Sequence, residues 1–133
     1  LTTINTDDLG VGQIIEDSFD YFDYISPMIY PSHYADGFMG FENPAEYPYE
    51  VVKYSMGKAI LKRELYSDKT KKKSAEIRPW LQDFNLGAIY DTNMVEQEIK
   101  AVAESMGEDF IGFMLWSPSN IYTKEAVLLE NPD

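Results

Sequence analysis

The segment D-Y-I-S-P-M-I-Y-P-S-H-Y, residues 23–34, says more about the fold of this chain than any other. An apolar run with a β-like composition, residues 24–29, ends in a polar and aromatic cluster of Tyr30, Ser32, His33 and Tyr34. A buried strand whose carboxyl end carries such side chains is typical of barrel enzymes, in which those ends form the active site. The segment therefore predicts a strand that leads into a functional site.

Two later segments repeat this pattern. They are I-R-P-W-L-Q-D-F, residues 77–84, and F-I-G-F-M-L-W-S-P-S-N, residues 110–120. Between the three predicted strands (24–30, 77–84 and 110–116), apolar residues recur at helical spacing, over residues 49–66 and again in a second helix. Strands that alternate with helices indicate right-handed crossovers and parallel pairing, so the sequence predicts an α/β fold.

Turn and cap signals set the expected ends of these elements. Asn93 with Glu96 resembles a capping box at the start of the second helix, and Gly107 is a suitable C-terminal stop. Residues 31–48 form a long predicted loop, and residues 67–76 a polar, lysine-rich one. Short helical segments are expected over residues 12–19 and 126–129.

Alternate residues of a strand face opposite sides of a sheet, which divides the three predicted strands into two sets. One set is apolar throughout and suits packing under helices: Ile25, Pro27, Ile29, Ile77, Pro79, Leu81, Ile111, Phe113 and Leu115. The other is mixed: Ser26, Met28, Tyr30, Arg78, Trp80, Gln82, Gly112, Met114 and Trp116. A barrel interior with a site at its mouth predicts this division.

The 133 residues are enough for one domain, but three strands are too few for a closed barrel, which takes eight strands and about 250 residues. Either the chain is a small open α/β sheet or it is the C-terminal part of a barrel. Its first residue, Leu1, is not methionine, and this favours the second interpretation. We therefore expect residues 1–133 to be the C-terminal part, about the last three βα units, of a TIM (β/α)8 barrel.

The composition excludes several classes of function. A formal net charge of −12 argues against nucleic acid as a partner, because phosphate binding needs a basic surface. The absence of cysteine rules out disulfides, thiolate zinc sites and cysteine nucleophiles. No apolar run approaches the roughly 20 residues needed to cross a membrane. A single histidine cannot form a histidine-cluster metal site by itself, and no metal or organic cofactor is expected.

Together with T-D-D-L-G-V-G-Q (residues 6–13), the strand motifs D-Y-I-S-P-M-I-Y-P-S-H-Y, R-P-W-L-Q-D-F and G-F-M-L-W-S-P-S-N-I-Y-T resemble a known family. It is the bacterial putative glycosyl hydrolase domain, a TIM-barrel family of unassigned function that is distantly similar to the α-amylase superfamily. The resemblance covers nearly the whole chain. It implies a glycoside hydrolase acting on a polysaccharide, in the extracellular space or the cell envelope, with the first five strands upstream of Leu1.

The same resemblance suggests one catalytic candidate. In the α-amylase superfamily the nucleophile and the acid follow strands four and five, and a third carboxylate follows strand seven. Asp83, near the end of the second strand here, best matches the third and would stabilise charge in the transition state. The other two carboxylates would be missing, so this chain alone is expected to be inactive.

Five further residues are candidate carbohydrate contacts: Tyr30, His33, Tyr34, Gln82 and Trp116. The indole of Trp116 could stack on a sugar face, and the others could bond to hydroxyl groups. Each has a structural alternative. Trp116 could pack in the barrel interior, His33 and the tyrosines could make structural hydrogen bonds, and Gln82 or Asp83 could bond to a neighbouring loop.

Two functions remain open from the sequence. One is hydrolysis of a polysaccharide, with this chain carrying part of the active site. The other is a non-catalytic carbohydrate-binding or envelope-scaffold module that keeps the aromatic rings without a working pair of carboxylates. A part of a barrel would also expose unpaired sheet edges, so we expect the chain to associate with itself.

Overall fold

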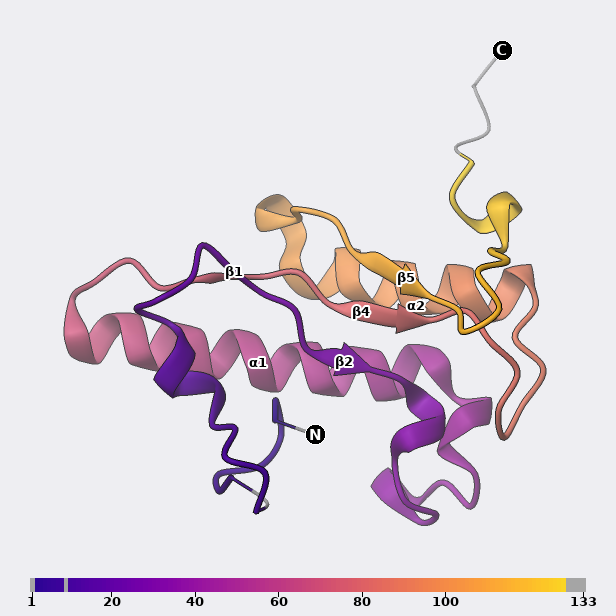
Figure 1. Ribbon diagram of the computed structural model, residues 1–133, viewed down its shortest axis with the longest axis horizontal. Coiled ribbons are helices and arrows are strands. Elements are labelled where there is room, and N and C mark those ends of the chain that lie inside the picture. Colours follow the sequence, from indigo (N-terminus) through magenta and orange to yellow (C-terminus); the bar gives the residue numbers. More distant parts are fainter. Residues whose placement is uncertain (1, 9, 129–133) are drawn as a thin grey trace.

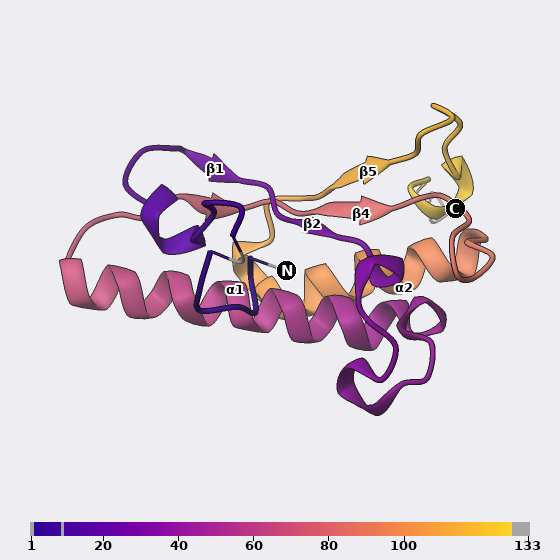
Figure 2. The ribbon, with the colours of Figure 1, turned by 60° about the horizontal axis from the view of Figure 1, so that its bottom comes forward.

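The computed structural model describes residues 2–8 and 10–128. They form a sheet layer and a helix layer (Figures 1 and 2). With η for a 3₁₀ turn, the elements in chain order are η1 (Ile15–Ser18), β1 (Tyr24–Ile25), β2 (Met28–Ile29), η2 (Pro31–His33), η3 (Phe38–Gly40), η4 (Pro44–Glu46), α1 (Pro48–Thr70), β3 (Glu76–Ile77), β4 (Trp80–Gln82), α2 (Thr92–Met106), η5 (Gly107–Asp109), β5 (Met114–Trp116) and η6 (Lys124–Ala126). The predicted α/β class with parallel strands is confirmed.

Every strand pair in the described chain is parallel. β1 pairs with β3, and β2, β4 and β5 form a three-stranded sheet in that order. Neighbours in this sheet follow each other along the chain, with α1 crossing from β2 towards β4 and α2 crossing from β4 to β5. Both helices lie on the same side of the strands (Figure 2). Within the described residues, no α-helix covers the other side.

Prolines divide the first two predicted strands. Pro27 separates β1 from β2, and Pro79 separates β3 from β4. Proline has no N–H to donate, so each interrupts the ladder without changing the course of the chain. The carbonyls still accept, because Pro27 O receives Trp80 N at 3.0 Å and Pro79 O receives Met114 N at 2.9 Å. The third predicted strand is shorter than expected and is limited to β5.

The alternation of the strands is confirmed where they pair most regularly. Ile29 and Leu81 are fully buried on the helix side, and Ile77 is 1% exposed. On the uncovered side, Met28 is 62% exposed and Trp116 is 44% exposed. Each buried aliphatic side chain contributes about 1.5–3 kcal/mol relative to exposure, so this face supplies much of the core.

The first long helix continues past its predicted end. α1 includes Ser67 to Thr70, which the sequence assigns to a polar loop, and that part of the expectation is wrong. The Thr70 hydroxyl donates to the carbonyl of Tyr66 at 2.8 Å, and the Ser67 and Ser74 hydroxyls are 2.6 Å apart. These local bonds stabilise a last turn that the charge pattern alone does not indicate. Lys71 then ends the helix in a left-handed conformation.

The N-cap of the second helix lies two residues before the predicted one. Asp91, not Asn93, is the N-cap, and its Oδ1 accepts the N–H of Met94 at 3.0 Å. The capping box of Asn93 with Glu96 is therefore wrong, because Asn93 already lies inside the first turn. Gly107 ends α2 with φ 57°, a backbone conformation that glycine adopts without strain, so the predicted stop is confirmed.

The two short helices are also shifted. The expected segment over residues 12–19 contains only η1, Ile15–Ser18, although Ile15 and Phe19 do anchor it in the core. The expected segment over residues 126–129 is preceded by η6, which ends at Ala126. Leu129 lies outside the described residues.

Two leucines provide a matched test of this core. Leu81 is fully buried in β4, whereas Leu65 is 59% exposed on α1. We expect Leu81→Ala to lower the free energy of unfolding by about 2–5 kcal/mol, because it leaves a cavity between sheet and helices. Leu65→Ala should change it by less than about 0.5 kcal/mol. Urea unfolding followed by circular dichroism measures both, and equal losses would contradict the assigned core.

Candidate functional site

The carboxyl ends of β2, β4 and β5 meet at one edge of the sheet, since parallel strands end on the same side (Figure 1). Backbone contacts continue past the strands there, with Asp83 N donating to Trp116 O at 2.9 Å. This edge brings together five of the six candidate residues: Tyr30, His33, Gln82, Asp83 and Trp116.

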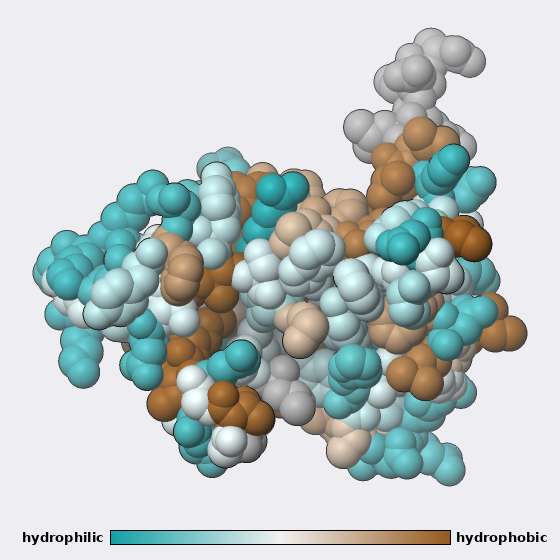
Figure 3. All heavy atoms as spheres, in the orientation of Figure 1, coloured by the Kyte–Doolittle hydropathy of each residue, from teal (hydrophilic) through white to brown (hydrophobic). Residues whose placement is uncertain are grey.

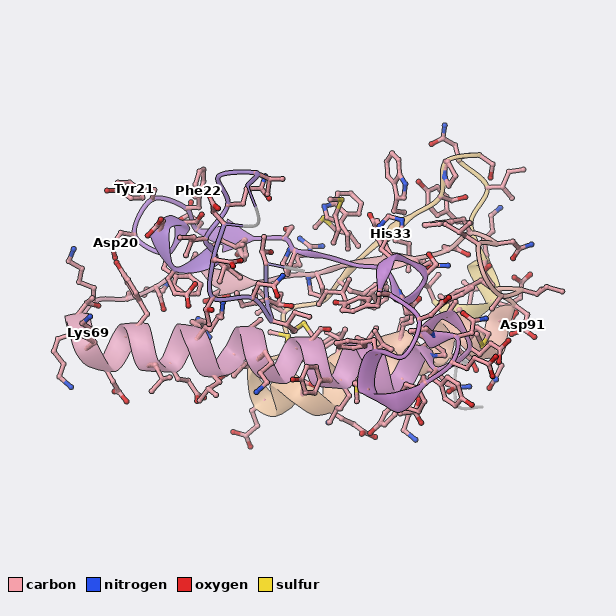
Figure 4. All side chains as sticks on the ribbon, turned by 90° about the horizontal axis from the view of Figure 1, so that it is seen from below. Asp20, Tyr21, Phe22, His33, Lys69 and Asp91 are labelled. Carbon is pink, nitrogen blue, oxygen red and sulfur yellow. The ribbon has the colours of Figure 1, made fainter. Side chains whose placement is uncertain are left out.

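Three rings form a cluster at the end of β2 and β4. The Tyr30 ring lies edge-on to those of His33, at 5.1 Å between centroids, and Phe84, at 5.6 Å. His33 and Phe84 are 6.3 Å apart. His33 is exposed and lies on the side of the sheet opposite α1 (Figure 4). Phe84 is the last residue of the predicted strand 77–84. It joins the site, although the sequence pattern gave it no role.

Burial determines the chemistry of the Tyr30 hydroxyl. Tyr30 is 4% exposed, and burial, with a smaller effect of Glu98, raises its pKa to about 12. The phenol therefore stays protonated at any physiological pH and can donate a hydrogen bond. It cannot act as a base there.

Gln82 is fully buried, and its side-chain amide is engaged within the protein. Its Oε1 accepts from the backbone N–H of Ser32 at 3.1 Å and from the Ser32 hydroxyl at 2.8 Å. Its Nε2 donates to the carbonyl of Phe84 at 3.0 Å. These bonds tie the turn after β2 to the end of β4.

Asp83 is 5% exposed, and a later loop orients its carboxylate. Oδ2 accepts the backbone N–H of Thr123 at 2.8 Å, and Oδ1 accepts the Thr123 hydroxyl at 2.7 Å. The two bonds fix the carboxylate at the strand end and hold the segment after β5 against the edge.

Trp116 offers an accessible indole ring at the edge. It is 44% exposed and packs against Trp80 in a T-shaped contact, with ring centroids 6.3 Å apart and planes at 86°. Met28 and Met114 lie beside Trp80 across the ladder. The uncovered face is thus apolar and aromatic, with its tryptophans towards the site edge.

Tyr34 departs from the other candidates. It is 5% exposed, its hydroxyl lies 2.7 Å from the Ser55 hydroxyl of α1, and burial raises its pKa. The ring packs on Phe38 at 4.7 Å. Its polar group therefore points into the helix layer, and only its flank borders the surface near His33.

A half-open hollow of about 830 Å³ lies between the N-terminal segment and the sheet. Among its lining residues are Gln13, Asp17, Ser26, His33 and Trp80. This volume falls within the range of small-ligand sites, and the mixture of apolar walls with a few polar groups is typical of them. His33 is the residue that joins this hollow to the aromatic cluster.

One buried carboxyl lies directly behind the edge. Glu98 of α2 is fully buried, and its Oε1 accepts the N–H of Gln82 at 3.2 Å, while Oε2 has no hydrogen-bond partner among the described residues. Burial raises the pKa of Glu98 well above its usual value. The Gln82 N–H opposes this shift, and the charge of Asp83 adds to it. The carboxyl therefore favours its neutral form.

Sequence reasoning did not single out Glu98, although a signal was present. Val95, Glu98, Ala101 and Val102 share one helix face, and all four are fully buried. A glutamate in the middle of an apolar stripe is unusual, because burying a carboxyl is costly unless it gains specific bonds. The charge of Glu98 also helps to raise the pKa of Tyr90, although burial is the larger cause.

Two features are absent from the described residues. No group of three or more His, Cys, Asp and Glu side chains within residues 2–8 and 10–128 is arranged to hold a metal ion. Over the same part of the chain, no helix is long and apolar enough to cross a membrane.

These features define an α/β protein whose parallel strands deliver aromatic, amide and carboxylate groups to one edge. The chain belongs to the family described as putative glycosyl hydrolase domain, whose family model matches residues 1–122. The family assignment made from the strand motifs is thus confirmed, and the chain is glycoside-hydrolase-like. No curated protein and no solved structure matches it significantly.

The raised pKa of Glu98 predicts a specific pH dependence of stability. A carboxyl whose pKa is raised on folding stabilises fully below its unfolded-state value, near 4.5, and this contribution is lost as pH rises through the folded pKa. Relative to Glu98→Gln, wild-type stability should therefore fall above about pH 4.5, by at most about 1.4 kcal/mol per pH unit.

Urea unfolding at several pH values measures this difference. Glu96→Gln replaces an exposed glutamate of the same helix and should follow the wild-type profile. Parallel profiles for the wild type and Glu98→Gln would show that Glu98 ionises in the folded protein as it does in the unfolded one. The groups that face Glu98 and share its environment are Asp83, Tyr30 and Tyr90.

Proposed function

We propose that residues 1–133 form the last three βα units of a (β/α)8 barrel and carry part of the active site of a glycoside hydrolase. The observation that carries this proposal is that α1 and α2 lie on the same face of a sheet whose strands follow in the order β2, β4, β5. With right-handed crossovers, a sheet that grows in one direction keeps its helices on one side and closes into a barrel. A doubly wound sheet would have helices on both faces.

The uncovered face supports the same proposal. Parallel sheets are normally buried on both faces. Here one face leaves Met28 62% exposed and Trp116 44% exposed, with Trp80 and Met114 partly exposed. In a closed barrel these side chains would fill the interior, and the edge with Tyr30 and Trp116 would be its catalytic mouth.

The chemistry of the edge suits a polysaccharide. Aromatic rings stack on the apolar faces of sugars, and Trp116 has the exposed ring for this role. His33 is an exposed polar group at the same edge, and Tyr30 is a permanent hydrogen-bond donor. Gln82 and Tyr34, the other proposed carbohydrate contacts, have their polar atoms bonded inside the protein and would have to exchange these bonds for a hydroxyl group.

Asp83 is the proposed catalytic carboxylate of this part of the site. It would stabilise the positive charge that develops on the sugar ring in the transition state. The two bonds from Thr123 support this role because they orient the carboxylate before substrate arrives. The nucleophile and the general acid would come from the remaining strands of the barrel, and the substrate would be a polysaccharide, such as one of the bacterial envelope.

One observation favours the alternative, a non-catalytic carbohydrate-binding or envelope-scaffold module. Asp83 is 5% exposed, and Glu98 is fully buried behind the edge. Hydrolysis needs two carboxyl groups about 5–10 Å apart across the sugar bond, both reaching the substrate. The aromatic rings alone would suffice for binding.

A longer protein that contains this chain and the upstream strands would distinguish the two functions in a screen of polysaccharides for hydrolysis. If the chain is part of a hydrolase, Asp83→Asn should lower kcat/KM by at least about 100-fold, a usual loss when charge stabilisation is removed. Asp23→Asn changes an exposed aspartate at the other end of the sheet and should leave it unchanged.

Two further outcomes would revise the proposal. Cleavage that survives Asp83→Asn would keep the enzyme and remove Asp83 from its mechanism. No cleavage, with polysaccharide binding that is lost in Trp116→Ala but kept in Phe22→Ala, would contradict the hydrolase and favour the binding module. Phe22 is an exposed ring at the opposite end from His33 (Figure 4).

The same proposal implies that this chain by itself associates. β2 and β5 are the outer strands of the three-stranded sheet, and their free backbone groups can pair with a further strand. Ile121 and Leu128, near the C-terminal end of the described chain, are 76% and 69% exposed. Figure 3 shows brown, apolar surface next to the grey C-terminal residues. In the barrel, neighbouring strands would pair with β2 and β5.

A further inference from the structure

The turn that carries His33 begins with a backbone group that needs a partner from elsewhere. The first N–H groups of any helical turn have no acceptor within the turn. In η2 the first residue, Pro31, has no N–H, so Ser32 presents the first one. Gln82 Oε1 accepts this N–H at 3.1 Å and the Ser32 hydroxyl at 2.8 Å. A side chain of β4 therefore begins the turn after β2.

Gln82 is also held from the helix layer. The β2–β4 ladder pairs Ile29 with Leu81, so the Gln82 N–H lies at its end. Glu98 Oε1 of α2 accepts this N–H at 3.2 Å. The carboxyl thus ties the backbone from which the Gln82 amide projects to α2.

The same amide reaches the aromatic cluster from its other side. Gln82 Nε2 donates to the carbonyl of Phe84 at 3.0 Å, and the Phe84 ring packs against Tyr30 and His33. His33 N closes the turn by donating to Tyr30 O at 2.9 Å. His33 is consequently held by two routes, through Ser32 and through Phe84, and both lead to Gln82.

We infer that Glu98 and Gln82 are positioning residues that hold the His33 imidazole at the mouth of the site, ready to contact a hydroxyl group of the ligand. Neither touches the ligand in this assignment. Only the identity of the ligand as a carbohydrate rests on the proposed function. The geometry of the pair does not. Both side chains are fully buried, and each places an oxygen on a backbone N–H near the end of a strand.

The single histidine of the chain makes this inference directly measurable. Its ring gives one set of Cε1–H and Cδ2–H resonances in a ¹³C–¹H NMR spectrum, and nearby aromatic rings displace them from their unfolded positions. We expect Gln82→Ala and Glu98→Ala to move these resonances most of the way towards those of the urea-unfolded chain. Glu98→Gln should restore the wild-type positions, since its amide oxygen can still accept the Gln82 N–H.

Two variants guard against simple unfolding. Ser32→Ala removes only the hydroxyl bond to Gln82 from a partly exposed turn and should give a smaller displacement in the same direction. Ser105→Ala removes a hydroxyl bond on α2 far along the helix, to the carbonyl of Ala101, and should leave His33 unchanged. Circular dichroism confirms that each variant is folded.

The inference is overturned if folded Gln82→Ala, Glu98→Ala and Ser32→Ala all keep the wild-type His33 resonances. It is also overturned if Glu98→Gln behaves like Glu98→Ala, since the acceptor oxygen would then not be what matters. Because none of these spectra requires activity, failure of the hydrolase proposal leaves this result independent. Displaced His33 resonances in these variants would still establish that Gln82 and Glu98 position His33, even if the protein has no hydrolase activity.

Discussion

The packing of one aliphatic sheet face against α1 and α2 is the interaction on which the other features of this structure depend. Ile29 and Leu81 are fully buried there, with Val52 and Met56 of α1 and Val102 of α2 in the same cluster. Because α1 and α2 each return the chain from the end of one strand towards the start of the next, the strands run parallel and end together. The alternate side chains must then point the other way, which places Trp80 and Trp116 on the uncovered face and the polar groups along one edge.

At that edge, side-chain oxygens accept hydrogen bonds from backbone N–H groups near the ends of the strands and in the loops that follow. Glu98 accepts the N–H of Gln82, Gln82 accepts that of Ser32, and Asp83 accepts that of Thr123. Buried N–H groups are costly without partners, so these contacts fix the loops as firmly as strand pairing would. The exposed rings of His33 and Trp116 are presented on this framework, and the division of labour between buried holders and exposed rings suits ligand binding.

The sequence predicted the parts of this fold that repeat. The alternation of Ile29 with Met28 and of Leu81 with Trp80 gave the two faces, and the strand ends gave five residues that meet at one edge. The ends of the helices were predicted less well, because neighbouring residues offer competing loop and cap signals. A lysine-rich run suggested a loop where serine and threonine bonds prolong α1. Asn93 suggested a cap two residues late, because Asp91, which is also a residue type favoured at N-caps, precedes it.

The connections across the sheet could not be predicted from sequence, because they depend on which side chains a fold brings together. Nothing in the local pattern pairs Asp83 with Thr123, or Tyr34 with Ser55 of α1. Glu98 is the instructive case. Its charge suggests a solvated helix face, but its spacing from Val95 and Val102 places it in the core. There its carboxyl oxygen accepts the N–H of Gln82. The face of the sheet away from both helices is left uncovered in the described chain.

Acrylamide quenching of tryptophan fluorescence tests most directly whether that face is the inside of a barrel. The chain has two tryptophans, both on the uncovered face, and Trp116→Phe leaves Trp80 as the reporter. Barrel closure predicts that Trp80 is readily quenched in this chain and strongly protected in a longer protein that supplies the upstream strands. Equal quenching of Trp80 in the two proteins would contradict the barrel.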